Sequence, residues 1–144
     1  VTTGGIEFLD HSLIHELHIK PEAIADARVA QMQELQRREL TYRGSQPLPN
    51  LSGRNVFLID DGLATGASMR VAIAAVRKQA ARKIILAVPV APRETLDTLS
   101  PLVDEVICLI TPDPFRAVGQ WYANFNQTSD EEVHQLLSSA WRRT

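Results

Sequence analysis

Cysteine is nearly absent from this sequence of 144 residues, because Cys108 stands alone and has no partner for a disulfide within the chain. Long apolar runs are absent as well, so no segment reaches the ~20 residues that a transmembrane helix needs. The first five residues lack the basic and apolar regions of a signal peptide. By default, these absences favour a cytoplasmic protein with no membrane partner.

An excess of charge of either sign is also absent, since 15 basic residues nearly balance 17 acidic ones. The formal net charge is −2 at pH 7, so no strong field attracts nucleic acid or an anionic membrane. Any phosphate must therefore be held by a local arrangement of groups. With 44% hydrophobic and 22% charged residues, the chain has an ordinary globular composition. Its length predicts a single domain over residues 1–144, with an N-terminal part (1–53), an α/β core (54–128) and a C-terminal helix (129–144).

Continuous apolar runs predict the core of an α/β fold. Three runs predict buried strands: Asn55–Asp60, Lys83–Val90 and Asp104–Ile110. Helices are predicted at Pro21–Leu40, Ala67–Ala81, Arg93–Leu99 and Ser129–Trp141, and a short strand at Ile6–Leu9. Strands that alternate with helices at these spacings predict a parallel sheet with right-handed crossovers. Ligands bind beyond the carboxyl ends of such strands, so the loops after Ile59 and Ile110 are the candidate sites.

The loop after Ile59 combines acids, small residues and hydroxyls. Asp60 and Asp61 come first, and Gly62–Ser68 then leads into a helix. Small residues let main-chain N–H groups approach an anion closely, and a helix N-terminus adds a positive dipole end. The hydroxyls of Thr65 and Ser68 add donors. This order suits a sugar phosphate, with the phosphate on the amides and the sugar hydroxyls on the acids.

Other phosphate loops do not fit this segment. An ATP-binding P-loop needs a lysine, and no lysine lies between Gly62 and Lys78. A dinucleotide loop has its acid about 20 residues after the glycines, whereas these acids come directly before them. The remaining alternative is a plain strand-to-helix turn with a surface pair of aspartates.

The segment Phe57–Ser68 resembles the signature of type I phosphoribosyltransferases, which binds 5-phosphoribosyl diphosphate (PRPP). Four further stretches resemble a bacterial subgroup of predicted phosphoribosyltransferases: Gly4–Gly5, Leu40–Gly44, Val88–Pro92 and Thr111–Tyr122. The resemblance covers nearly the whole chain. It implies a Rossmann-like type I phosphoribosyltransferase fold with a parallel sheet.

The resemblance also implies a reaction and the residues that carry it. Family members transfer a phosphoribosyl group from PRPP to a nitrogen acceptor, usually a nucleobase, and release pyrophosphate. By resemblance, the catalytic residues Asp60 and Asp61 bind the ribose hydroxyls directly or through Mg²⁺. The PRPP-binding residues are then Asp60, Asp61, Gly62, Leu63, Ala64, Thr65, Gly66, Ala67 and Ser68. Ala64 resembles the adenine-type loop more than the loop of enzymes for 6-oxopurines.

The loop after Ile110 is the candidate acceptor site. Many phosphoribosyltransferases hold the acceptor base at this place, often against an aromatic side chain. Phe115 is the candidate for stacking on the base, and Asp113 can accept a hydrogen bond from an exocyclic amine. The alternative is that Phe115 closes the core under a long loop, as we expect of Trp121 and Phe125.

The chain departs from the family at its start. Subgroup members carry an upstream loop that resembles Leu-Pro-Arg-Gly-Gly and binds pyrophosphate, and no such loop precedes Gly4. We therefore expect the fold to be incomplete at its N-terminus. Two alternatives to an enzyme stay open: a non-catalytic regulatory domain that binds PRPP or a nucleotide, and an interaction domain with a vestigial loop. Open sheet edges in this family also predict a homo-oligomer.

Two further groups of residues have simpler interpretations. Cys108 lies within a predicted strand and is interpreted as a small core residue. His11 and His15 have the spacing of one helical face, which would allow them to share a metal ion. Because no third ligand is evident, we interpret them as surface residues.

Overall fold

The computed structural model describes residues 5–44 and 46–141, which fall into two compact units. The sheet unit consists of residues 5–8 and 50–125, and the helical unit of residues 9–44, 46–49 and 126–141. The single domain expected over residues 1–144 stays a prediction, because compactness does not show whether the units fold independently. None of the helices in the described residues is long and apolar enough to cross a membrane.

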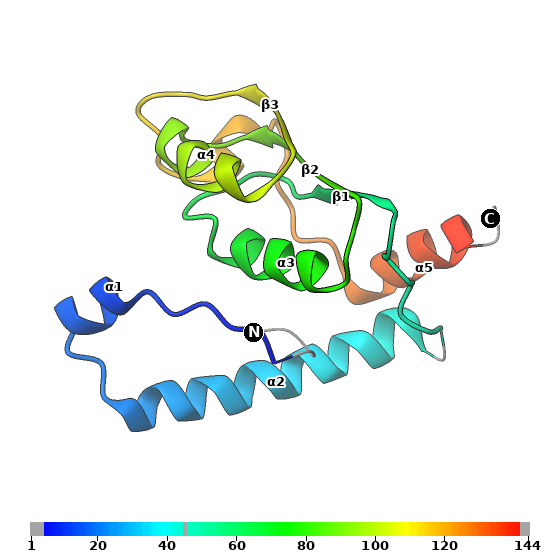
Figure 1. Ribbon diagram of the computed structural model, residues 1–144, viewed down its shortest axis with the longest axis horizontal. Helices are drawn as coiled ribbons and strands as arrows, with labels where there is room; N and C mark the ends of the chain where they lie inside the picture. Colours follow the sequence, from blue (N-terminus) through cyan, green and yellow to red (C-terminus); the bar gives the residue numbers. More distant parts are fainter. Residues whose placement is uncertain (1–4, 45, 142–144) are drawn as a thin grey trace. The chain divides into compact units, whose positions relative to one another are not determined.

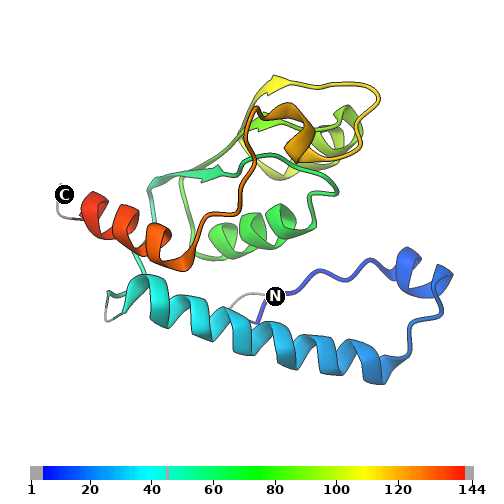
Figure 2. The same ribbon diagram turned by 180° about the vertical axis from the view of Figure 1, so that it is seen from behind.

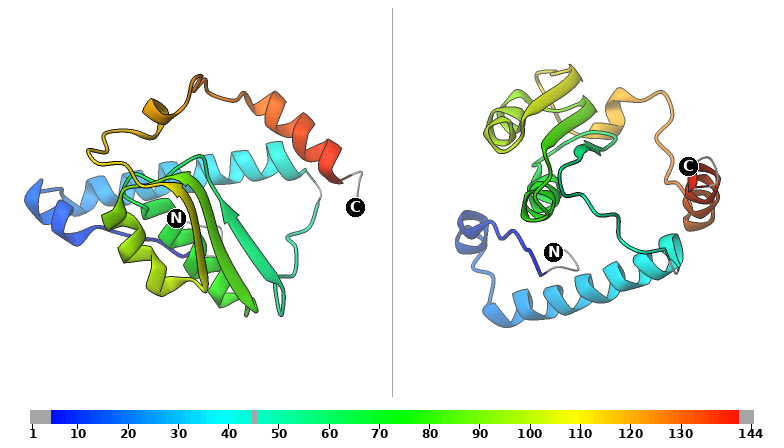
Figure 3. Two further views of the ribbon diagram at one scale, coloured as in Figure 1. Left: turned by 90° about the horizontal axis from the view of Figure 1, so that it is seen from above. Right: turned by 45° about the vertical axis from the view of Figure 1, so that its right-hand side comes forward.

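The sheet unit has a parallel sheet of three strands in the order β1-β2-β3 (Figure 1). The strands are β1 (Asn55–Ile59), β2 (Lys83–Val90) and β3 (Glu105–Ile110), and they run side by side in Figure 3. Helix α3 (Ala67–Lys78) connects β1 to β2, and α4 (Arg93–Leu99) connects β2 to β3 with a short 3₁₀ helix, η1 (Ser100–Leu102). A second 3₁₀ helix, η2 (Val118–Trp121), follows β3. The predicted α/β fold with a parallel sheet is confirmed.

One face of the sheet carries the core. Ile84 and Leu86 of β2 are fully buried against α3 and α4, which contribute Ile73 and Leu99 among others. Asp104 fixes the start of β3, because its carboxylate accepts a hydrogen bond from the Ile84 N–H at 2.7 Å. This bond, together with the nearby Arg77 guanidinium, lowers the pKa of Asp104 below its ordinary value.

The other face of the sheet is open, which corrects part of the prediction. We expected three buried strands, but Phe57 and Ile59 of β1 are 58% and 74% exposed. On β3, Ile107 and Leu109 are 42% and 76% exposed. The strand register places Ile59 and Ile107 beside Ala87 of β2, on the face opposite the core. Only β2 has the burial that a continuous apolar run predicts.

The helical unit contains α1 (His11–Glu16), α2 (Pro21–Arg43) and α5 (Asp130–Trp141), seen from behind in Figure 2. Asp130 joins the last two helices, since it accepts hydrogen bonds from the Tyr42 hydroxyl at 2.5 Å and from Arg37 at 2.7 Å. Ser129 caps α5 as predicted, because its Oγ accepts from the Glu132 N–H at 3.2 Å.

The strand predicted at Ile6–Leu9 is wrong. This segment forms no strand, and the chain enters α1 directly after it. The Asp10 carboxylate caps α1 by accepting a hydrogen bond from the Leu13 N–H at 3.0 Å. Aspartate is among the strongest N-cap residues, so Asp10 starts a helix where we had expected only the end of a strand.

Candidate functional site

The loop between β1 and α3 begins with two exposed acids, Asp60 and Asp61. After them the chain turns inward, and the side chain of Leu63 is only 3% exposed within the core. The Leu63 N–H donates to the Val90 carbonyl at 3.0 Å, which ties the loop to the end of β2. Gly66 then enters α3 with a left-handed φ of 72°. The loop therefore lies across the carboxyl ends of two neighbouring strands.

Two glycines fit where no larger residue does. A Cβ atom on Gly62 would lie 2.6 Å from a methyl carbon of Val118 and 2.9 Å from one of Val90. A Cβ atom on Gly66 would lie 3.0 Å from both Leu99 and Thr95. Close packing therefore requires glycine at both positions, and the left-handed φ is a second reason at Gly66.

Several main-chain N–H groups of this loop have no acceptor among the described residues, and of these Ala64 and Thr65 are exposed whereas Gly62 and Gly66 are buried. Within residues 5–44 and 46–141, the N–H groups of Gly62, Ala64, Thr65 and Gly66 donate no hydrogen bond. The Leu63 N–H is taken by Val90, so Leu63 contributes its side chain to the core rather than a free donor. The side chains of Thr65 and Ser68 are exposed beside the free groups, whereas Ala67 is half-buried. Clustered free amides at a helix N-terminus form an anion-binding concavity.

The acid pair has one hydrogen bond within it and one from outside it. The Asp60 carboxylate accepts a hydrogen bond from the Asp61 N–H at 3.0 Å, and the Tyr122 hydroxyl donates to the main-chain oxygen of Asp61. Both carboxylates are exposed at the strand end. Two carboxylates at a phosphate loop fit Mg²⁺, which takes one or two protein carboxylates and completes its shell with substrate oxygens and water.

The described residues offer no alternative centre for a metal ion. No group of three His, Cys, Asp or Glu side chains among them is placed to hold one. His15 lies against His18, with ring centroids 6.4 Å apart, and His18 bonds to the Glu16 carbonyl. Asp60 and Asp61 are only two carboxylates, so a metal held by them would need further oxygens from a ligand or water.

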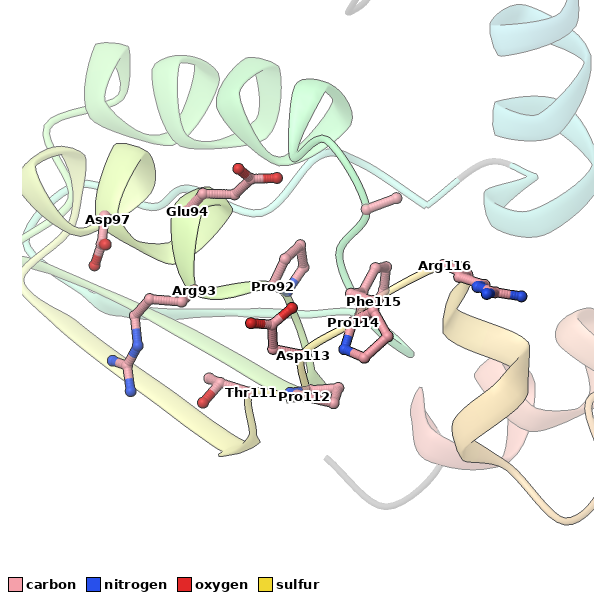
Figure 4. A pocket seen from close by; sticks show the side chains of 11 residues that line it. Pro92, Arg93, Glu94, Asp97, Thr111, Pro112, Asp113, Pro114, Phe115 and Arg116 are labelled. Atoms are coloured by element: carbon pink, nitrogen blue, oxygen red, sulfur yellow. The ribbon is translucent and has the colours of Figure 1, made fainter.

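A cavity of about 560 Å³ adjoins this loop. Ala64 lines it from the loop, and both acceptor candidates, Asp113 and Phe115, line it from the segment after β3 (Figure 4). Asp60, Asp61, Thr65 and Ser68 are not among its lining residues. The structure thus brings the acceptor candidates together with the middle of the phosphate loop, and the acids lie on the loop outside this cavity.

The start of α4 forms a wall of the cavity that sequence reasoning missed. Pro92, Arg93, Glu94 and Asp97 line the cavity there. In the view of Figure 4, Asp113 lies between Arg93 on one side and Arg116 on the other. The signal was available, because α4 follows the carboxyl end of the strand that ends at Val90, where ligands of parallel sheets bind.

Two hydroxyls that touch the loop from distant positions were also missed. Thr95 of α4 donates to the main-chain oxygen of Ala64 at 2.6 Å. Tyr122 reaches Asp61 from beyond η2 and packs against Phe125, with ring centroids 5.2 Å apart. The expectation that Trp121 and Phe125 close the core is wrong, since they are 41% and 50% exposed.

A family model described as the phosphoribosyl transferase domain matches residues 1–125 of the chain. The chain belongs to the type I phosphoribosyltransferase superfamily. This membership confirms the resemblance that the Phe57–Ser68 loop indicated and the fold that it implied.

Relatives with the same family name cover almost all of the chain. Two proteins of Mycobacterium tuberculosis, named "Putative phosphoribosyl transferase Rv0571c" (strain H37Rv) and "Putative phosphoribosyl transferase MT0597" (strain CDC 1551), are each 39% identical to it over 138 residues. The match covers 96% of this chain but 31% of each relative. The crystal structure of TT1426 from Thermus thermophilus is 34% identical, with a TM-score of 0.74 over 94% of this chain and 64% of that one. The chain therefore spans about a third of the length of the curated relatives from M. tuberculosis.

Proposed function

We propose that the chain binds PRPP with Mg²⁺ and transfers its 5-phosphoribosyl group to a nitrogen acceptor, with release of pyrophosphate. The observation that carries this proposal is the pairing of free loop amides, at Gly62 and Ala64–Gly66, with the acids Asp60 and Asp61 at one strand end. In this arrangement the amides take the 5-phosphate, and the carboxylates take the ribose hydroxyls.

The proposed transfer depends mainly on alignment of the reactants and on stabilisation of the charge that develops during the reaction. The bond from the ribose C1 to the pyrophosphate oxygen breaks, a bond from C1 to the acceptor nitrogen forms, and the acceptor gives up a proton. Mg²⁺ would neutralise charge on the departing pyrophosphate. Asp60 and Asp61 hold the ribose ring while positive charge develops at C1, and the fixed amides prevent the sugar phosphate from turning.

For the acceptor we propose a planar nitrogen base in the cavity of about 560 Å³. Phe115 is half-buried in its wall and offers a stacking surface, while the exposed carboxylate of Asp113 can accept a hydrogen bond from an exocyclic amine. Ala64 leaves the loop wall without a carboxylate. These groups suit an amino-substituted base such as adenine better than a 6-oxopurine.

Calorimetry with PRPP and MgCl₂ tests the binding step. The double variant Asp60→Asn with Asp61→Asn is expected to keep phosphate binding but to weaken PRPP binding in MgCl₂ by about tenfold or more, because hydrogen bonds to charged groups contribute about 1.5–3 kcal/mol each. Gly66→Val should also weaken PRPP binding, because its side chain would meet Leu99 and Thr95 and displace the loop. The matched control is Glu131→Gln with Glu132→Gln, an adjacent exposed pair on α5. Unchanged PRPP affinity in both loop variants would refute the assignment.

Pyrophosphate release during a screen of purines, pyrimidines and amines tests the transfer step. Release with one class of acceptor supports an enzyme, whereas PRPP binding without release for any acceptor favours a regulatory domain. Phe115→Ala and Asp113→Asn should raise the acceptor KM and leave ribose 5-phosphate affinity unchanged. A Phe115→Ala variant with unaltered acceptor affinity would remove Phe115 from the site.

A further inference from the structure

Thr95 touches the phosphate loop on both sides of Thr65. Its side chain is 6% exposed, and its Oγ1 donates a hydrogen bond to the main-chain oxygen of Ala64 at 2.6 Å. Its methyl carbon lies 3.0 Å from the position that a Cβ atom on Gly66 would occupy. Among the described residues, Thr95 is the only buried polar side chain. A single residue of α4 therefore contacts the peptide before Thr65 and the residue after it.

The bond to Ala64 decides where the Thr65 N–H points. A trans peptide is planar, and its C=O and N–H point in opposite directions. Because the Ala64 carbonyl points inward to the buried Thr95 hydroxyl, the N–H of the same peptide points away from Thr95. Thr65 itself is exposed, and its N–H donates to no group in residues 5–44 and 46–141.

We propose that Thr95 is a positioning residue of the phosphate loop, whose hydroxyl turns the Ala64–Thr65 peptide so that the Thr65 N–H faces the 5-phosphate. This inference rests on the proposed function, since it takes the loop to be the sugar-phosphate site. Thr95 does not touch the ligand and acts through the orientation of one donor. The competing interpretation is that Thr95 is a core residue whose hydroxyl is satisfied by the nearest carbonyl.

Three variants of Thr95 and one control variant distinguish the effect of its hydroxyl from that of its methyl group. Thr95→Val keeps the shape and removes the hydroxyl, and Thr95→Ser keeps the hydroxyl and removes the methyl group. Should Thr95→Val fail to fold, Thr95→Ala compared with Thr95→Ser still isolates the hydroxyl. The matched control is Thr98→Val, because Thr98 lies on the same helix and its hydroxyl donates to the Thr95 carbonyl at 2.8 Å, not to the loop.

The binding probe is ribose 5-phosphate, measured by calorimetry with the whole chain. Thr95→Val is expected to weaken binding by about tenfold, because a misdirected donor forfeits a hydrogen bond to a charged phosphate. Thr95→Ser should bind within about threefold of the parent, and Thr98→Val should equal it. The proposal would be overturned if Thr95→Val bound ribose 5-phosphate as tightly as the parent, or if Thr98→Val lost as much affinity as Thr95→Val.

A second measurement needs no ligand. The amide resonances of residues 62–66 in the free protein should shift in Thr95→Val and not in Thr98→Val, and Thr95→Ser should restore them. If the parent binds no ribose 5-phosphate but these shifts occur, the proposed function fails while the control of the peptide by Thr95 stands. If the amide resonances of residues 62–66 did not shift in Thr95→Val, the positioning role would be refuted whether or not the parent binds ribose 5-phosphate.

Discussion

The Tyr122 hydroxyl donates a hydrogen bond to the main-chain oxygen of Asp61 at 2.5 Å, across 61 positions of sequence. The segment after β3 therefore braces the acid pair directly. Val118 of the same segment fills the space beside Gly62, and Phe125 packs on the ring of Tyr122. Because residues 111–116 of this segment line the cavity, the proposed acceptor site and the acids are tied together by one stretch of chain.

Removing the Tyr122 hydroxyl should leave Asp60 and Asp61 less firmly positioned. We expect Tyr122→Phe to weaken binding of PRPP in MgCl₂ by about threefold to tenfold, since a neutral hydrogen bond contributes about 0.5–1.5 kcal/mol. Tyr42→Phe is the matched control, because Tyr42 also donates to an oxygen at 2.5 Å but lies in the helical unit. Calorimetry of both variants checks this. Comparable losses in the two would show that the effect is general and not transmitted through Asp61.

Alanine substitutions at two glycines with similar φ angles can distinguish the cost of backbone strain from the cost of overpacking. Gly53 has a φ of 69° with nothing within 4 Å of an added Cβ, whereas at Gly66, with a φ of 72°, a Cβ would meet Leu99 and Thr95 at 3.0 Å. Gly53→Ala should lower the free energy of unfolding by about 1–2 kcal/mol through the left-handed backbone alone. Gly66→Ala should cost about 1–3 kcal/mol more, because it overpacks the core.

Chemical denaturation of the two glycine variants measures this difference. Ribose 5-phosphate binding should fall in Gly66→Ala and stay unchanged in Gly53→Ala, since only Gly66 belongs to the loop. If Gly53→Ala were the more destabilising of the two, Leu99 and Thr95 would not be what excludes a side chain at Gly66.

Asp104 should make the sheet unit sensitive to acid. Its pKa is lowered, chiefly by the hydrogen bond from the Ile84 N–H and then by Arg77. A carboxyl with a lower pKa in the folded state stabilises the fold above its unfolded pKa, and this stabilisation is lost as pH falls through the folded value. The free energy of unfolding should therefore decline below about pH 4.

The variant Asp104→Asn isolates this contribution. It should be less stable than the parent at pH 7 and should converge toward the parent as the parent is acidified. The control is Asp97→Asn on the neighbouring helix α4, which lacks these partners among the interactions of the described residues. A difference between Asp104→Asn and the parent that does not change with pH would contradict the assignment.

Much of the fold was predictable because it is encoded locally. The strands at Lys83–Val90 and at residues 105–110 begin and end close to their predicted bounds, and the helix from Pro21 runs slightly past its predicted end. The open face was not predictable, because an apolar run does not reveal whether one or both of its faces are covered. Phe57 and Leu109 look the same in sequence as the buried Ile84.

The candidate site also has a part that the sequence predicted and a part that it did not. The order of Asp60, Asp61 and the small residues after them was readable because these groups adjoin in the chain. Thr95 and Tyr122 lie 31 and 61 positions from the carbonyls that they bind. A main-chain carbonyl carries no side-chain signature, so only the tertiary structure identifies such partners. The Mg²⁺ site, the homo-oligomer and the cytoplasmic location stay predictions.

The junction of α2 and α5 should depend on one carboxylate. Asp130 accepts from Tyr42 and Arg37, and these bonds lower its pKa, with Tyr42 as the larger cause. The same bond raises the pKa of the Tyr42 phenol. Asp130→Asn should therefore increase amide hydrogen exchange in α5 at pH 7, because the pairing with both donors weakens. Glu131→Gln, one residue along the same turn, should leave that exchange nearly unchanged. Protection that is equal in Asp130→Asn and the parent would show that the two helices are held by their apolar contacts rather than by this carboxylate.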